Sequence, residues 1–106
     1  ASGVTIEIES ARVPLIPGAL GLAAEGLLTS GDKSNRLYVG ADAEIGAAVG
    51  RELDSLLFDP QTAGGLLISV AESRAEALLA RLRETYPEAA RIGCVRERAT
   101  HSIIVK

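Results

Sequence analysis

One short run of residues combines side chains that can bind a ligand with the backbone freedom that binding requires. Asp59, Gln61 and Thr62 supply a carboxylate, an amide and a hydroxyl, and Gly64 and Gly65 follow at once. Two successive glycines let a backbone approach another group closely, so that its N–H groups can contact an anion such as phosphate. The alternative interpretation is a purely structural turn, which lets the following strand pack closely against a helix.

Other reactive residue types give weaker signals. Residues 26–34 nearly match a phosphate-binding P-loop, but Asp32 is inserted before Lys33 and would place an anion where phosphate sits. Cys94 has neither a histidine nor a cationic helix end near it in the sequence, which indicates a small packed residue. The single His101 indicates a surface or hairpin position. Because one histidine and one cysteine cannot make a zinc site, we predict no metal site.

Composition limits the class of protein. The 106 residues are 47% hydrophobic and 24% charged, which predicts a single globular domain over residues 1–106. A net charge of −3 and only three aromatic residues disfavour nucleic acid and anionic membranes as partners. No apolar run reaches the ~20 residues that span a bilayer and no signal peptide opens the chain, so we expect the cytoplasm. Five arginines are dispersed among acids and indicate a solvated surface: Arg81, Arg83, Arg91, Arg96 and Arg98.

Hydrophobic periodicity predicts the helices that must position these residues. Pro17 suits the first position of a helix that Gly26 would stop. Apolar residues at helical spacing predict a second helix over residues 43–57, although Gly46 and Gly50 weaken its early turns. A third helix over residues 73–86 would begin with a capping box that starts at Ser73.

Alternating and continuous apolar runs predict the strands. We expect them at residues 4–9, 36–39, 64–70, 90–96 and 101–106, with 64–70 central in the sheet. The last two would pair as a hairpin around residues 97–100, with Ile92, Cys94, Ile103 and Val105 facing inward. A closing hairpin favours an α+β fold, with helices on a mixed or antiparallel sheet, over a doubly wound parallel sheet.

The run Asp-Pro-Gln-Thr-Ala-Gly-Gly-Leu-Leu at residues 59–67 resembles a known signature. Selenophosphate synthetases (selenide, water dikinases) carry Asp-Pro-Gln-Thr-(Ser/Ala)-Gly-Gly-Leu-Leu in their C-terminal half. The Val-Pro-x-x-Pro-Gly-Ala segment at residues 13–19, and Gly31 followed by Asn35 and Arg36, are similar to further segments of that family.

The resemblance implies a fold shared with aminoimidazole ribonucleotide synthetase and a parent enzyme of two domains. Such enzymes make selenophosphate from selenide and ATP, release AMP and phosphate, and use magnesium. Residues 59–65 would then face the cleft between the domains, with Asp59, Gln61, Thr62, Gly64 and Gly65 as cofactor-binding residues. The family's catalytic Cys and Lys, its glycine-rich ATP segment and most of its metal-binding aspartates lie in the N-terminal domain and have no counterpart here.

We therefore expect the C-terminal domain of a longer enzyme, with no catalytic residue and no activity of its own. The absence of methionine, with Ala1 at the start, also indicates a piece of a longer protein. ATP and Mg²⁺ would bind to the parent and not to this chain, and the expected partners are its own N-terminal catalytic domain and a second copy. Two alternatives remain: another ATP-dependent enzyme of the same superfamily, or a freestanding α+β binding or dimerisation module.

Overall fold

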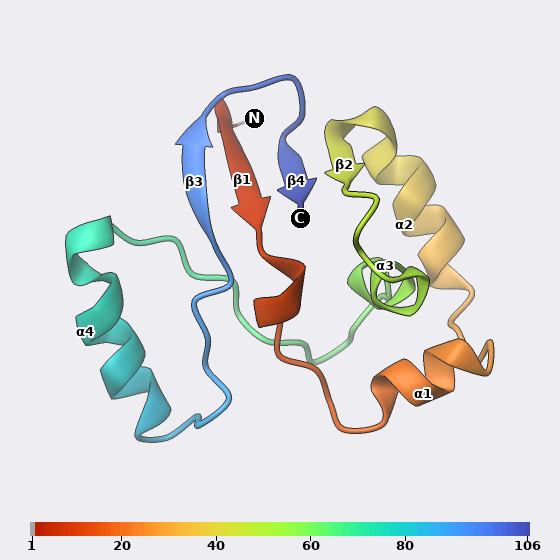
Figure 1. Cartoon of the computed structure of the whole chain (residues 1–106), viewed down its shortest axis with the longest axis horizontal. Coiled ribbons are helices and arrows are strands. Elements are labelled where there is room, and N and C mark those ends of the chain that lie inside the picture. The colour runs from red at the N-terminus through yellow and green to blue at the C-terminus, as the bar shows by residue number, and fades with distance from the viewer. Residues whose placement is uncertain (1) are drawn as a thin grey trace.

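A mixed four-stranded sheet lies between the helices of this computed structural model, which describes residues 2–106 (Figure 1). The strands follow the order β2-β4-β1-β3. β1 runs antiparallel to β3 and parallel to β4, and β2 runs parallel to β4. The sheet confirms the predicted α+β class. The strands are β1 (Val4–Ile8), β2 (Ala43–Ile45), β3 (Gly93–Glu97) and β4 (Ile103–Val105).

β1 confirms the strand predicted from its alternating, β-branched sequence. Thr5 is 1% exposed, and its hydroxyl donates to the His101 carbonyl at 2.7 Å and accepts from the Ala99 N–H at 2.9 Å. This buried hydroxyl is therefore fully satisfied, which keeps the cost of its burial low. Opposite the other end of β1, a side chain on Gly93 would collide with the Glu7 carbonyl, so the close approach of β3 requires glycine there.

The predicted hairpin between the last two strands is wrong, because β1 lies between β3 and β4. The connecting residues 98–102 cross the end of β1 instead of forming a tight turn. They contain no glycine or asparagine to adopt the positive φ angles of a two-residue hairpin turn, whereas β1 can accept a strand at each edge. Of the residues predicted to face inward, Val105 is buried and Ile92, Cys94 and Ile103 are half-buried.

Four α-helices flank the sheet: α1 (Ala19–Ala24), α2 (Gly31–Val39), α3 (Arg51–Leu57) and α4 (Glu72–Arg83). Figure 1 shows α4 beyond β3, while the other three gather near β2, where α1 packs against α3. Two short 3₁₀ helices, η1 (Ser10–Arg12) and η2 (Gly40–Asp42), complete the elements. α1 and α4 confirm the helices predicted at residues 17–26 and 73–86. The capping box does not form, since the cap of α4 is Ala71 and no side chain bonds there. No helix among residues 2–106 combines the length and apolar character that crossing a membrane requires.

The strand predicted at residues 36–39 is wrong, because these residues form the end of α2. An ion pair between Asp32 and Arg36, four positions apart, supports the helix from its first turn. The helix predicted over residues 43–57 is only half right, since α3 begins at Arg51 and residues 43–45 form β2. The Gly46 N–H donates to the Val105 carbonyl at 2.8 Å, so pairing with β4 prevails where glycine weakens the helix.

The central strand predicted at residues 64–70 is also wrong, because this segment forms no strand and pairs with none of the four. Both edges of β1 are already occupied, and β4 is paired on its second edge with β2. Leu66 is 91% exposed and Leu67 is 65% exposed. The accessible surface is 7951 Å², whereas a compact monomer of 11.0 kDa would expose about 5,600 Å². The chain thus leaves much apolar surface open.

Candidate functional site

The predicted cofactor-binding residues lie in one loop that leaves the C-terminal end of α3. Asp59 is half-buried, whereas Gln61, Thr62, Gly64 and Gly65 are exposed. The structure therefore brings them together as an accessible loop, which we call the signature loop (residues 59–65). Its conformation depends on α2 and α3, which hold its first residues in place.

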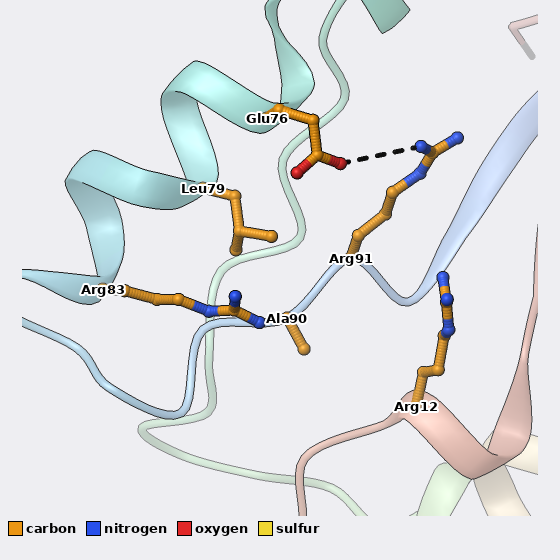
Figure 2. A pocket seen from close by; sticks show the side chains of 6 residues that line it. All are labelled: Arg12, Glu76, Leu79, Arg83, Ala90 and Arg91. Atoms are coloured by element: carbon orange, nitrogen blue, oxygen red, sulfur yellow. Dashed lines mark ion pairs between the residues drawn. The ribbon is translucent and has the colours of Figure 1, made fainter.

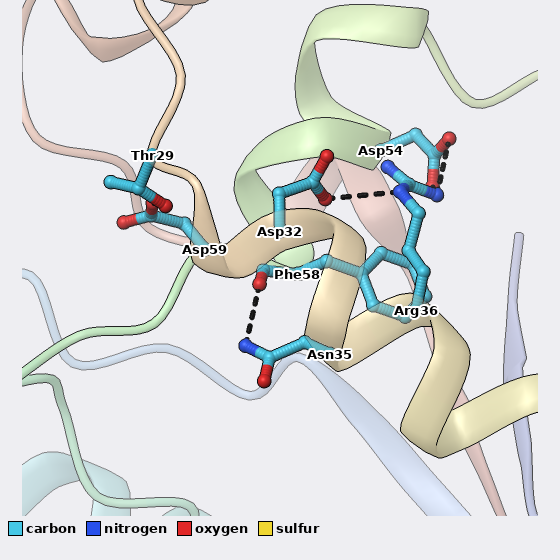
Figure 3. Close-up of polar contacts among 7 residues, drawn as sticks. All are labelled: Thr29, Asp32, Asn35, Arg36, Asp54, Phe58 and Asp59. Atoms are coloured by element: carbon cyan, nitrogen blue, oxygen red, sulfur yellow. Dashed lines mark hydrogen bonds and ion pairs between the residues drawn. The ribbon is translucent and has the colours of Figure 1, made fainter.

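Arg36 of α2 joins the two helices to the start of this loop (Figure 3). Its Nη1 lies 3.0 and 3.1 Å from the two carboxylate oxygens of Asp54, and its Nε lies 3.0 Å from Asp32 Oδ1. The guanidinium also lies over the Phe58 ring, 4.2 Å from its centroid. Partial burial acts to lower the pKa of Arg36, but its hydrogen bond to Asp54 and the charges of Asp54 and Asp32 outweigh it and raise the pKa. The guanidinium therefore stays charged and links α2 to α3 and to the start of the loop.

Three further contacts fix the backbone of the loop. Asn35 Nδ2 donates to the Phe58 carbonyl at 2.8 Å, and Thr29 Oγ1 donates to Asp59 Oδ1 at 2.7 Å (Figure 3). The Pro60 ring lies so close to Gly31 that a side chain on Gly31 would collide with it. Three residues of the Gly-x-x-x-Asn-Arg segment therefore support the same stretch of backbone. Gly31, Asn35 and Arg36 all contact the chain between Asp54 and Pro60.

The second half of the loop leaves its backbone donors open. Within the described part of the chain, no N–H group from residue 61 to residue 70 donates to a backbone carbonyl. The Gln61 side chain folds over Gly64, where a Cβ would lie 2.6 Å from Gln61 Oε1, while Gly65 has open space around its Cα. Neither glycine has a positive φ. The exposed N–H groups, the Gln61 amide and the Thr62 hydroxyl are suited to bind an oxyanion.

The weaker sequence signals have structural roles in this arrangement. The P-loop-like residues 26–34 run into the first turn of α2, where Asp32 binds Arg36. Cys94 is half-buried with its Sγ 3.8 Å from Glu7 Oε2, and His101 Nδ1 lies 2.8 Å from the Ala41 carbonyl oxygen. Among residues 2–106, no three His, Cys, Asp or Glu side chains are grouped so that they could hold a metal ion.

The acidic partners of Arg36 could not be recognised from the sequence. Asp32 and Arg36 have the four-residue spacing of an ion pair on a helix. This spacing predicts an ion pair only if residues 31–39 are already known to form a helix. Asp54 is 18 residues further along, and no local pattern links it to Arg36.

Comparison with known proteins then decides the family. No protein-family model matches the chain. The selenide, water dikinase of Pelobacter propionicus is 46% identical over 106 residues, which is 99% of this chain and 30% of that enzyme. The enzyme of the same name from Caldanaerobacter subterraneus is 43% identical over 99% of the chain, and that from Clostridioides difficile is 47% identical over 74%. The chain belongs to the selenide, water dikinase family.

This membership confirms the resemblance read from residues 59–67. The chain spans about 30% of the length of the selenide, water dikinases named above from Pelobacter propionicus and Caldanaerobacter subterraneus, and the matching part is the C-terminal portion of the family's enzymes. The signature loop and the Arg36 contacts therefore correspond to the C-terminal portion of these relatives.

Proposed function

We propose that this chain forms one wall of the active-site cleft of a selenide, water dikinase and supports the catalytic N-terminal domain. The parent enzyme transfers phosphate from ATP to selenide, forms selenophosphate and releases AMP and phosphate. ATP and Mg²⁺ are held by the N-terminal domain, which also supplies the catalytic residues. The observation that carries this proposal is the 46% identity to a selenide, water dikinase over almost the whole chain.

We assign the signature loop to the cleft-facing side of the domain. Its first residues are held by Arg36, Asn35 and Thr29, whereas its later N–H groups are exposed and have no backbone acceptor among the described residues. A rigidly supported loop with exposed donors can contact the phosphate groups of a nucleotide without reorganising when the nucleotide binds. This arrangement supports a binding role for Asp59, Gln61, Thr62, Gly64 and Gly65.

The test uses the full-length parent enzyme, with selenophosphate and AMP measured as products from selenide and Mg-ATP. Gly65→Ala adds a methyl group to the exposed face of the loop, where the structure has open space. We expect kcat/KM for ATP to fall at least tenfold. Gly21→Ala, in α1, adds the same methyl group where space is also open, and we expect it to leave kcat/KM unchanged. Equal activity of both variants would contradict the cleft-facing role of the loop.

The chain by itself is proposed to have no kinase activity. Calorimetry of the isolated chain with Mg-ATP should give no tight binding, and a micromolar Kd would assign the nucleotide site to this domain instead. We place the parent enzyme in the cytoplasm.

We further propose that the exposed apolar surface is covered in the parent, by the N-terminal domain or by a second copy of the chain. Ile16 and Leu66 are 79% and 91% exposed, and apolar surface of this kind promotes association. Analytical ultracentrifugation of the isolated chain should therefore show a dimer at moderate concentration, and a monomer at every concentration would contradict self-association.

A further inference from the structure

A second site, separate from the signature loop, lies between η1, α4 and the segment that precedes β3 (Figure 2). It is a pocket of about 350 Å³, and none of residues 59–65 lines it. Its walls are made by Arg12, Glu76, Leu79, Arg83, Ala90 and Arg91. Three of these six residues are arginines, which come from three different segments of the chain.

Each arginine is anchored through only part of its guanidinium. Arg83 Nε donates to the Ala89 carbonyl at 2.9 Å, and Arg12 Nε lies 3.1 Å from Glu9 Oε2. Arg91 is held from the rim by Glu72 at 3.4 Å and Glu76 at 4.0 Å. Because a guanidinium has five N–H donors, these contacts orient the groups and leave Nη donors of Arg12 and Arg83 for a ligand.

Cations predominate among the residues that line the pocket. Three of the six are arginines and one is a carboxylate, while Glu9 and Glu72 pair with Arg12 and Arg91 from outside the lining. Leu79 and Ala90 add apolar surface between the charged side chains. The sequence indicated a dispersed, solvated role for Arg83 and Arg91. The fold instead places both of them in the lining of one pocket with Arg12, which is roughly 70 to 80 residues earlier in the chain.

We propose that this pocket binds a phosphate group, either as inorganic phosphate or as the phosphate of a small phosphorylated molecule. The planar fork of arginine matches the paired oxygens of phosphate, and several guanidinium groups favour a dianion over a single carboxylate. The volume lies at the lower end of small-ligand sites, so it admits phosphate together with a small organic group. Arg83 contributes most of the binding, because its contact is with a neutral carbonyl, whereas carboxylates already engage Arg12 and Arg91.

The test is an NMR titration of the 106-residue chain with inorganic phosphate at constant ionic strength. We expect saturable shifts of the Arg83 Nε–H signal and of the backbone amides of residues 89–91. Arg83→Gln and Arg12→Gln should each weaken binding at least tenfold. The Arg12 side chain is 53% exposed and belongs to η1, so its variant reports on binding even if Arg83→Gln disturbs the Ala89 contact. Arg81→Gln, on the same helix but outside the pocket, is the matched control and should bind as the wild type does.

Two further ligands distinguish the sources of the phosphate. AMP that binds more tightly than inorganic phosphate would indicate a phosphorylated molecule, and equal or weaker binding would indicate free phosphate. The proposal is overturned if phosphate gives no saturable shifts, if Arg81→Gln weakens binding as much as Arg83→Gln, or if adenosine binds as well as AMP.

Discussion

Replacement of Arg36 by methionine tests the link between α2, α3 and the signature loop most directly. The change removes both contacts to Asp54, the contact to Asp32 and the charge over the Phe58 ring, while it keeps a side chain of similar length. The Arg36 and Asp54 side chains are 34% and 26% exposed, so solvent screens their attraction in part. We therefore assign about 1 kcal/mol to the ion pair with Asp54, between the values for exposed and buried pairs.

The helical pair with Asp32 adds about 0.5 kcal/mol and the stacking on Phe58 about 0.5–1 kcal/mol. Arg36→Met should thus lower the free energy of unfolding by about 2 kcal/mol, a large share of the stability of a domain of this size. Urea denaturation followed by circular dichroism measures the change, and the slope with urea should stay constant. Arg51→Met replaces an exposed arginine on α3 and should change stability by less than about 0.5 kcal/mol. If Arg36→Met also lowers the free energy of unfolding by less than about 0.5 kcal/mol, the contacts of the Arg36 guanidinium do not stabilise the fold.

Four other substitutions test the remaining structural arguments. Gly31→Ala should destabilise by about 1–2 kcal/mol in thermal or urea unfolding, because the collision with the proline ring of the loop outweighs the better helix propensity of alanine; a gain in stability would contradict the close approach. The hydrogen bond from Lys106, together with neighbouring cationic charge, holds the pKa of Glu7 below its ordinary value despite partial desolvation. This contribution to stability is present above the ordinary glutamate pKa and is lost as pH falls through the lowered pKa, so Lys106→Met should reduce stability at pH 7 but not in strong acid. Val105→Ala should cost about 2 kcal/mol because Val105 is 3% exposed, whereas Leu66→Ala should change stability by less than about 0.5 kcal/mol, and similar losses for both would place Leu66 in the core.

The parts of the fold that sequence could predict are those whose stabilisation is local. The alternation that identifies β1, and the apolar periodicity that identifies α4, are properties of neighbouring residues. Residues 64–70 show the limit of prediction from local sequence. Their apolar character indicates a preference for burial, but it does not indicate which strand they would pair with. In the same way, β2 forms only because β4 is available to pair with residues 43–45.

The candidate site also has a part that the sequence predicts and a part that depends on the folded chain. The residues of the signature loop could be picked out from their types and spacing, and their binding role stays a prediction. Their support could not, since the contact between Arg36 and Asp54 depends on how two helices pack. The three arginines of the second pocket were missed for the same reason, because Arg12 meets Arg83 and Arg91 only in the folded chain.

The bonds of Thr5 set the order in which this chain can fold during synthesis. Its hydroxyl contacts Ala99 and His101, which follow it by 94 and 96 residues, and within residues 2–106 the neighbours of β1 in the sheet are β3 and β4. At about 5–20 residues per second, a ribosome makes β1 several seconds before either of its partners exists. Both edges of the strand stay open during that time, and so widely separated contacts also close slowly once the partners emerge. The nascent β1 is therefore the point at which a chaperone would protect this domain most effectively.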